Sequence, residues 1–278
     1  MKLSVCTISF RHHLHSISQL AEWAQVKDFQ GIELWGVHAK NLKKDPSYNK
    51  HWLSSYSLNT SMISDYLPLH LPNCDLMRAT RDLSELGNIW GTNKLRTFAG
   101  QQSSLTTSDQ DRKSIVLNLK KICKELEKED QYLLLETHPN TLTDTVPSTL
   151  QLLNEVDHPS LRVNFDVLHI WESGVDPVDA LLKLKPFVMH YHFKNISSRD
   201  KLDVFSPDNV YAAAGSRDGM VPLFEGVLNY HDFIMSALSM TDVEASLEWF
   251  GGNVKEVLEK DAEQIRNLAK NRSRLYVS

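Results

Sequence analysis

Hydrophobic residues gather in short runs that alternate along the whole chain with longer amphipathic segments. Eight of these runs have the length and composition of buried strands, and they cover residues 3–9, 31–36, 61–67, 94–99, 132–138, 161–167, 188–194 and 245–250. The segments between them are long enough for crossover helices, expected at residues 16–29, 75–90, 108–130, 147–156, 177–184, 230–240 and 254–271. Plausible helix caps occur at Ser16, Asp75, Ser108 and Asp176. The pattern predicts an α/β chain of repeated βα units.

Eight βα units in 278 residues fit a (β/α)₈ TIM barrel, a fold of about 250 residues in its usual form. No low-complexity tract, proline-rich linker or run of like charge divides the sequence, so residues 1–278 are expected to form a single domain. A doubly wound sheet is the alternative. The glycine-rich phosphate turn of that fold does not follow the first run, which favours the barrel.

Four of the strand-like runs in the second half of the chain end in a residue type that binds metal ions. These residues are Glu136, Asp166, His192 and Glu248. Three carboxylates and one imidazole suit a hard divalent cation, and a parallel barrel brings the ends of successive strands to one point. The sequence therefore predicts a site for one divalent metal ion, with Mn²⁺ favoured over Mg²⁺ because Mn²⁺ tolerates an imidazole ligand better.

Strand parity places further polar residues beside these four. Side chains alternate between the two faces of a strand, so His138 shares the face of Glu136, and Lys194 shares that of His192. Arg96 lies on the corresponding face of the fourth run. We expect this polar face to line the barrel interior near its catalytic mouth. His138 is then the candidate general base, with a structural role in the following turn as its alternative.

Less specific interpretations compete with a metal site. A single carboxylate at a strand end is most often a helix cap or a solvated loop residue. Arg96 and Lys194 also offer an ion-pair network that would stabilise buried carboxylates without a metal ion. Four such strand ends together favour the metal, because burying an uncompensated carboxylate costs several kcal/mol.

Composition narrows the class of protein. With 30 basic and 35 acidic residues the formal net charge is −5, which disfavours a protein that coats nucleic acid or an anionic membrane. No apolar stretch reaches the roughly 20 residues of a membrane span, and residues 3–10 do not resemble a signal peptide. Cys6, Cys74 and Cys123 are too few and too widely spaced for a disulfide framework. We expect a cytoplasmic protein with a small-molecule substrate; homo-oligomerisation stays open.

Motifs over nearly the whole chain resemble a known family. The four-ligand pattern is similar to that of the xylose isomerase-like sugar phosphate isomerase/epimerase superfamily of barrels. A closer resemblance rests on CTISFRHH, GIELWG, MISDYL, NKLRTFAGQ, LLETHPNTLTDT, NFDVLHIWESG, HYHFKNIS, NVYAAAG and SLEWFG. These segments resemble the metal-dependent 3-dehydroshikimate dehydratases of bacterial catechol siderophore pathways. The resemblance implies dehydration of 3-dehydroshikimate to protocatechuate.

The implied reaction agrees with the predicted site. Removing a proton next to a ketone builds negative charge on the carbonyl oxygen, which a divalent cation stabilises as a Lewis acid. His138 would take the proton, a role that the resemblance supports. Arg96 and Lys194 suit a carboxylated substrate. Around the substrate we expect Tyr66 as an acid or hydroxyl partner, and Glu33, His12, His169, Tyr211 and Phe250 as contacts.

Several of these contacts have alternatives. Glu33 has Arg96 as a second candidate partner, His169 is suited to orienting a loop, and both aromatic residues are also typical of a core. Among functions, a sugar or inositol isomerase, epimerase or dehydratase is the runner-up on the same barrel. A multi-metal nuclease would need more ligands and a basic groove, and a metal-free binding protein would not need the ligand set. The pathway, siderophore assembly or breakdown of quinate and shikimate, stays open.

Overall fold

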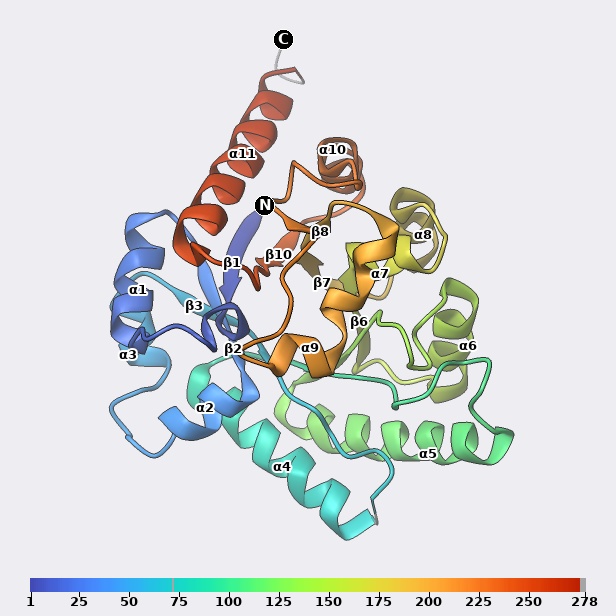
Figure 1. Ribbon diagram of the computed structural model, residues 1–278. Coiled ribbons are helices and arrows are strands. Elements are labelled where there is room, and N and C mark those ends of the chain that lie inside the picture. Colours follow the sequence, from blue (N-terminus) through green and yellow to red (C-terminus); the bar gives the residue numbers. More distant parts are fainter. Residues whose placement is uncertain (72, 276–278) are drawn as a thin grey trace.

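The computed structural model describes residues 1–71 and 73–275, and within them eight parallel strands close into a barrel surrounded by helices (Figure 1). The strands are β1 (Lys2–Cys6), β2 (Gly31–Trp35), β3 (Asn59–Ser64), β4 (Lys94–Thr97), β5 (Tyr132–Glu136), β6 (Leu161–Asp166), β7 (Val188–Phe193) and β10 (Glu244–Leu247). The barrel closes in the order β1-β10-β7-β6-β5-β4-β3-β2. The predicted single-domain (β/α)₈ barrel is confirmed.

Most strands end earlier than their hydrophobic runs. The run at 132–138 continues two residues past β5, and the run at 245–250 continues three residues past β10. The reason is that each chain segment leaves the sheet at the mouth of the barrel while its side chains are still buried. His138, Lys194 and Glu248 therefore stand just beyond the last paired residue of their strands.

The outer layer contains all seven predicted helices. They are α1 (Ile17–Val26), α4 (Asn73–Trp90), α5 (Asp109–Leu126), α6 (Val146–Val156), α8 (Pro177–Leu184), α10 (Tyr230–Met240) and α11 (Val254–Leu275). Three of the expected caps are present: Ser16 forms a capping box with Gln19, and Ser108 and Asp176 accept hydrogen bonds from the first turns of α5 and α8. The fourth is wrong, since α4 begins at Asn73 and Asp75 lies inside its first turn.

Short elements in the connections were not predicted. They are α2 (Gly36–Leu42), α3 (Lys50–Ser54), α7 (Val167–Glu172), α9 (Pro207–Tyr211), the 3₁₀ helix η3 (Arg199–Phe205), and the antiparallel pair β8 (Asn195–Ile196) and β9 (Met220–Val221). One or two turns are too few for a hydrophobic period to stand out. Figure 1 shows α9 lying across the mouth of the barrel.

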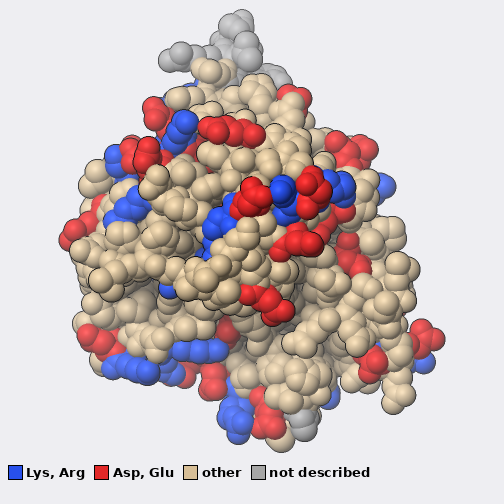
Figure 2. All heavy atoms as spheres, in the orientation of Figure 1, with Lys and Arg blue, Asp and Glu red and all other residues tan. Residues whose placement is uncertain are grey.

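The core lies between the outward strand faces and the helices. Outward residues such as Leu133, Leu135 and Phe165 are completely buried there. The inward faces carry polar and charged side chains instead, and many of these are just as buried. On the outside, Figure 2 shows basic and acidic side chains interspersed with uncharged residues over the visible face. No helix in the described part of the chain is long and apolar enough to cross a membrane.

Asp261 of α11 carries a buried carboxylate that should make stability depend on pH. Both of its oxygens accept the backbone N–H of Leu223 at 3.1 Å, and burial raises the pKa of Asp261 to about 7. Because this folded-state pKa lies above the unfolded value of about 4, the neutral acid favours folding at low pH, and that contribution disappears as the pH rises through about 7.

We therefore expect Asp261→Asn to remove a decrease in the free energy of unfolding of about 1.4 kcal/mol per pH unit between pH 5 and 7. Urea denaturation of both proteins across that range measures the difference. The exposed Asp82→Asn is the control, since it removes the same charge without changing a buried contact. Identical pH profiles for wild type and Asp261→Asn would contradict the expectation.

Candidate metal centre and active site

His192 faces a cluster of carboxylates from three other segments at the mouth of the barrel. Its Nδ1 atom lies 3.5 Å from Glu136 Oε1, 3.5 Å from Glu248 Oε1 and 3.9 Å from Asp166 Oδ2. All four side chains are buried, and among the described residues Nδ1 has no hydrogen-bond partner. The structure therefore brings the four expected ligands together, with three carboxylates facing one buried imidazole nitrogen.

Strand register explains this convergence. Asp166 on β6 and Ser246 on β10 both pair with His192 on β7. Glu248 follows Ser246 by two residues, and so it projects inward one step closer to the mouth. Two overlapping sets of side chains, Asp166 with His192 and Glu248, and Asp166 with Glu136 and His169, have one ligand atom per residue within 4.8 Å of the others.

Two cations also contact this cluster, so the ion pairs expected as an alternative are present. Arg96 Nε lies 2.9 Å from Glu136 Oε2. Lys194 Nζ lies 2.8 Å from Glu248 Oε2 and also contacts Asp166. A fourth carboxylate, Glu33, lies on the other side of His192. Two permanent cations against four carboxylates leave two negative charges, which is the charge that a divalent metal ion would balance.

The pKa values of His192 and Glu136 also indicate that the cluster favours an added positive charge. Burial alone would lower the pKa of His192, yet Glu33, Glu248 and Glu136 raise it well above its ordinary value. Burial likewise opposes ionisation of Glu136, but Arg96 and His192 hold its pKa well below the usual range. The donor set, its buried Nδ1 atom and its charge thus fit a divalent metal ion.

His138 lies beside this cluster with one ring nitrogen held by the backbone. Its Nδ1 is 2.8 Å from the carbonyl oxygen of Pro139. Since a carbonyl only accepts, Nδ1 must donate, and the lone pair then resides on Nε2, for which the described chain offers no hydrogen bond. Burial and the neighbouring His169 lower the pKa of His138 to about 3, so the imidazole is neutral at physiological pH. The structural contact expected as an alternative therefore coexists with a free basic nitrogen.

A small cavity of about 50 Å³ opens over the cluster and contains most of the expected site residues. Its walls include Tyr66, Arg96, Glu136, His138, His169, Lys194, Tyr211, Glu248 and Phe250. A larger cavity of about 710 Å³ adjoins it, and the two share Tyr66, Phe98, His138, Pro207 and Tyr211. The expected catalytic residues thus lie around one space, with ample room beside it.

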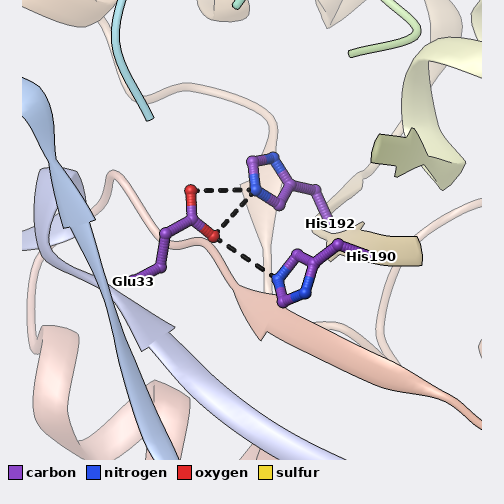
Figure 3. A group of neighbouring side chains, drawn as sticks. All are labelled: Glu33, His190 and His192. Carbon is purple, nitrogen blue, oxygen red and sulfur yellow. Dashed lines mark hydrogen bonds and ion pairs between the residues drawn. The ribbon is translucent and has the colours of Figure 1, made fainter. Parts of the chain in front are cut away.

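Two expected substrate contacts lie elsewhere. Glu33 is completely buried behind His192 and lines neither cavity. Figure 3 shows it pointing at His192 and His190. His12 is exposed in the loop after β1 and also lines neither cavity. These placements do not support direct contact with a substrate in the cavity.

A roof covers the site, and of its residues only Tyr211 was expected from the sequence to contact the substrate. It is formed by residues 199–211, which contribute Phe205, Pro207 and Val210 to the small cavity. Arg11, next to the expected His12, donates from Nε to the carbonyl of Val210 at 2.8 Å. The adjacent arginine in the RHH sequence was the only signal for this contact, and its partner is 199 residues away.

Tyr211 ends this roof and meets the opposite side of the mouth. Its hydroxyl lies 2.5 Å from that of Tyr66, and its ring stacks on Trp35 with centroids 5.9 Å apart. Neither tyrosine is a plain core residue, since they are 41% and 37% exposed. The contact joins the loop after β3 to the segment after β7.

Comparisons with known proteins agree with this architecture. A sequence model of the family described as a xylose isomerase-like TIM barrel matches residues 21–270. The chain is 51% identical over 274 residues to a 3-dehydroshikimate dehydratase of Bacillus anthracis, covering 96% of this chain and 97% of that protein. A crystal structure from the same organism, described as a probable 3-DHS dehydratase involved in petrobactin synthesis, has a TM-score of 0.90 at 51% identity and covers 95% of this chain and 98% of its own.

A more distantly related structure shares the fold with this chain. The crystal structure of the IOLI protein with a bound zinc atom has a TM-score of 0.76 at 14% identity. The alignment covers 98% of this chain and 97% of that one.

Proposed function

Since the chain belongs to the xylose isomerase-like TIM barrel family, we propose that it is a metal-dependent dehydratase that converts 3-dehydroshikimate to protocatechuate and water. The observation that carries the proposal is the 51% identity, over nearly the whole of both chains, to the dehydratase of Bacillus anthracis. The cavity supports it independently, because a neutral histidine, two cations and a carboxylate cluster surround one space. These are the groups that proton abstraction beside a ketone requires.

Glu136, Asp166, His192 and Glu248 would hold the metal ion. When bound, the ion supplies a Lewis acid that stabilises negative charge on the ketone oxygen as the neighbouring proton leaves. We favour Mn²⁺, with Mg²⁺ as a substitute, because the imidazole of His192 suits Mn²⁺ better. The charge balance of the cluster supports a divalent ion.

His138 would act as the base. Its Nε2 lone pair takes the proton from the carbon beside the ketone while Nδ1 stays bound to Pro139, so the ring keeps its orientation during the transfer. The hydroxyl on the next carbon then leaves as water after it gains a proton, and the ring becomes aromatic once its remaining CH₂ group loses a proton and the ketone oxygen gains one. Tyr66 is the candidate donor for that proton, because its partly exposed side chain lines the cavity.

Arg96 and Lys194 would act as the cations of the site. Both are buried and already bound to ligand carboxylates, so their first role is to balance the cluster. Both also line the cavity, and we propose that one of them meets the substrate carboxylate. His169, Tyr211 and Phe250 would then enclose the ring from the remaining sides.

A direct assay tests the proposal. Purified protein with Mn²⁺ and 3-dehydroshikimate should generate the ultraviolet absorbance of protocatechuate. Removal of metal with a chelator should abolish the rate, and added Mn²⁺ should restore it. The same protein supplied with ketoses or inositol derivatives is the comparison, since turnover of these instead of 3-dehydroshikimate would transfer the proposal to the isomerase and epimerase alternatives.

We also propose that the reaction takes place in the cytoplasm and supplies a catechol for siderophore assembly. The description of the Bacillus anthracis structure supports this pathway over breakdown of quinate and shikimate. Deleting the gene should reduce siderophore production under iron limitation and leave growth on quinate unchanged. The reverse pattern would favour the catabolic pathway.

A further inference from the structure

Glu33 lies in the barrel interior directly behind His192. It comes from the middle of β2, is fully buried, and is the nearest carboxylate to the Nε2 atom of His192. The two oxygens of Glu33 lie 2.9 and 3.1 Å from this nitrogen (Figure 3). A carboxylate can only accept, so Nε2 donates, and the lone pair of a neutral His192 must then be on Nδ1.

This bond determines what His192 presents to the mouth. Nδ1 is the atom that faces Glu136, Asp166 and Glu248 at 3.5–3.9 Å. A flipped or tautomerised ring would turn a hydrogen toward the carboxylates instead of a lone pair. Glu33 therefore sets both the rotation of the ring and the nitrogen that is free to bind an ion.

Glu33 is itself fixed by neighbouring strands. Ser64 at the end of β3 donates its hydroxyl hydrogen to Glu33 Oε1. His190 on β7 has its Nε2 3.6 Å from Glu33 Oε2 and 2.8 Å from the hydroxyl of Ser246. Four strands thus contribute to one buried polar group, an arrangement that costs desolvation energy and holds the carboxylate in one place.

Two other roles for Glu33 fit the geometry less well. A substrate contact is disfavoured because Glu33 lines neither cavity. A second metal ion is the other role, since Glu33, His190 and His192 each have one ligand atom within 4.8 Å of the others. However, the Glu33–His192 pair is already at hydrogen-bond distance, and none of the three side chains lines either cavity, where further ligands could enter.

We propose that Glu33 is a positioning residue that presents Nδ1 of His192 to the metal ion. The inference rests on the proposed metal-dependent function. Histidine ligands commonly donate their second nitrogen to a carboxylate, and loss of such a partner lowers metal affinity or activity by about 10- to 100-fold.

The test is Mn²⁺ binding by the metal-free protein, measured by calorimetry. We expect Glu33→Gln to weaken Mn²⁺ binding by at least about 10-fold, because the amide accepts more weakly and its NH₂ group can face His192. Glu244→Gln is the matched control: Glu244 pairs with Lys2 and Lys94 at the opposite end of the barrel, and its loss should leave Mn²⁺ affinity unchanged. If Glu33→Gln does not fold, Ser64→Ala provides the test, with an expected loss of a few-fold.

Turnover separates positioning from the other roles. Saturating Mn²⁺ should restore most of kcat in Glu33→Gln, with KM for 3-dehydroshikimate unchanged. Wild-type affinity for Mn²⁺ in both Glu33→Gln and Ser64→Ala would overturn the inference. A raised KM of Glu33→Gln with normal Mn²⁺ affinity would also overturn it. So would the binding of two Mn²⁺ ions by wild type and of one by Glu33→Gln. Mn²⁺ binding without any conversion of 3-dehydroshikimate by wild type would overturn the proposed function and leave this inference standing.

Discussion

Replacing His138 by alanine should lower kcat by about 10²- to 10⁴-fold, the range typical of a lost general base. The reason lies in the ring's two nitrogens, one bound to the carbonyl of Pro139 and the other free beside the cavity. The variant should bind Mn²⁺ nearly as well as wild type, because within the described part of the chain His138 forms its hydrogen bond with Pro139 and none with the four expected ligand side chains. The rate of protocatechuate formation and calorimetric Mn²⁺ binding measure the two effects separately.

The control for His138 is His231→Ala, since His231 lies exposed on α10 and lines neither cavity. It should retain the wild-type rate. A near-normal kcat in His138→Ala would exclude His138 as the essential base. A loss of both rate and Mn²⁺ affinity would instead assign His138 to the metal centre.

Glu248→Gln should weaken Mn²⁺ binding by more than about 100-fold, beyond the range expected for partners outside the ligand set. Glu248 is the most informative ligand to change because Lys194 keeps Asp166 as a partner when Glu248 is neutralised. The buried ammonium is therefore not left unpaired, and the fold should survive. Activity should be very low at micromolar Mn²⁺ and recover in part as Mn²⁺ is raised.

Glu225→Gln controls for the change of charge, since Glu225 is exposed and pairs only with Lys260 in the described region. Its Mn²⁺ affinity should equal that of wild type. Calorimetric Mn²⁺ binding by Glu248→Gln and Glu225→Gln tests whether Glu248 is a metal ligand. Unchanged affinity in Glu248→Gln would remove Glu248 from the ligand set and leave its contact with Lys194 as its role.

Strand parity accounts for most of what could be predicted from the sequence. Side chains alternate strictly along a strand, so the inward direction of Arg96, Glu136 and His192 follows from the sequence once the strands are located. Their meeting point also follows, because parallel strands end together at one mouth. In the structure Arg96 and Glu136 line the small cavity, and His192 lies beside Glu136 in the carboxylate cluster.

Depth inside the barrel could not be predicted in the same way. The sequence predicted that Glu33 points inward. It did not predict the position of Glu33 along the barrel axis, because the strands of a barrel are tilted and staggered relative to one another. Glu33 pairs with Cys6 and Met62, two residues before the end of β2. That stagger puts it behind His192 instead of beside the substrate.

The roof could not be predicted because its conformation depends on contacts between distant segments. Residues 199–211 form only short helical turns, and they are held by Arg11 from the start of the chain. The hydrophobic pattern within this segment does not predict a contact with a residue so distant in the sequence. Phe205 and Val210 therefore became site residues only through the tertiary fold.

The hydroxyl contact between Tyr66 and Tyr211 has a consequence for the order of events in catalysis. Both tyrosines line the small and the large cavity, so they stand where the two spaces meet. The small cavity holds only a few water molecules, and a ring acid that enters from the larger one has to separate the pair. The proposed metal ligands lie deeper than this tyrosine pair, so in the proposed reaction the ion would bind before the substrate. A bound substrate would then block the route of a chelator to the ion, and metal exchange would wait for product release.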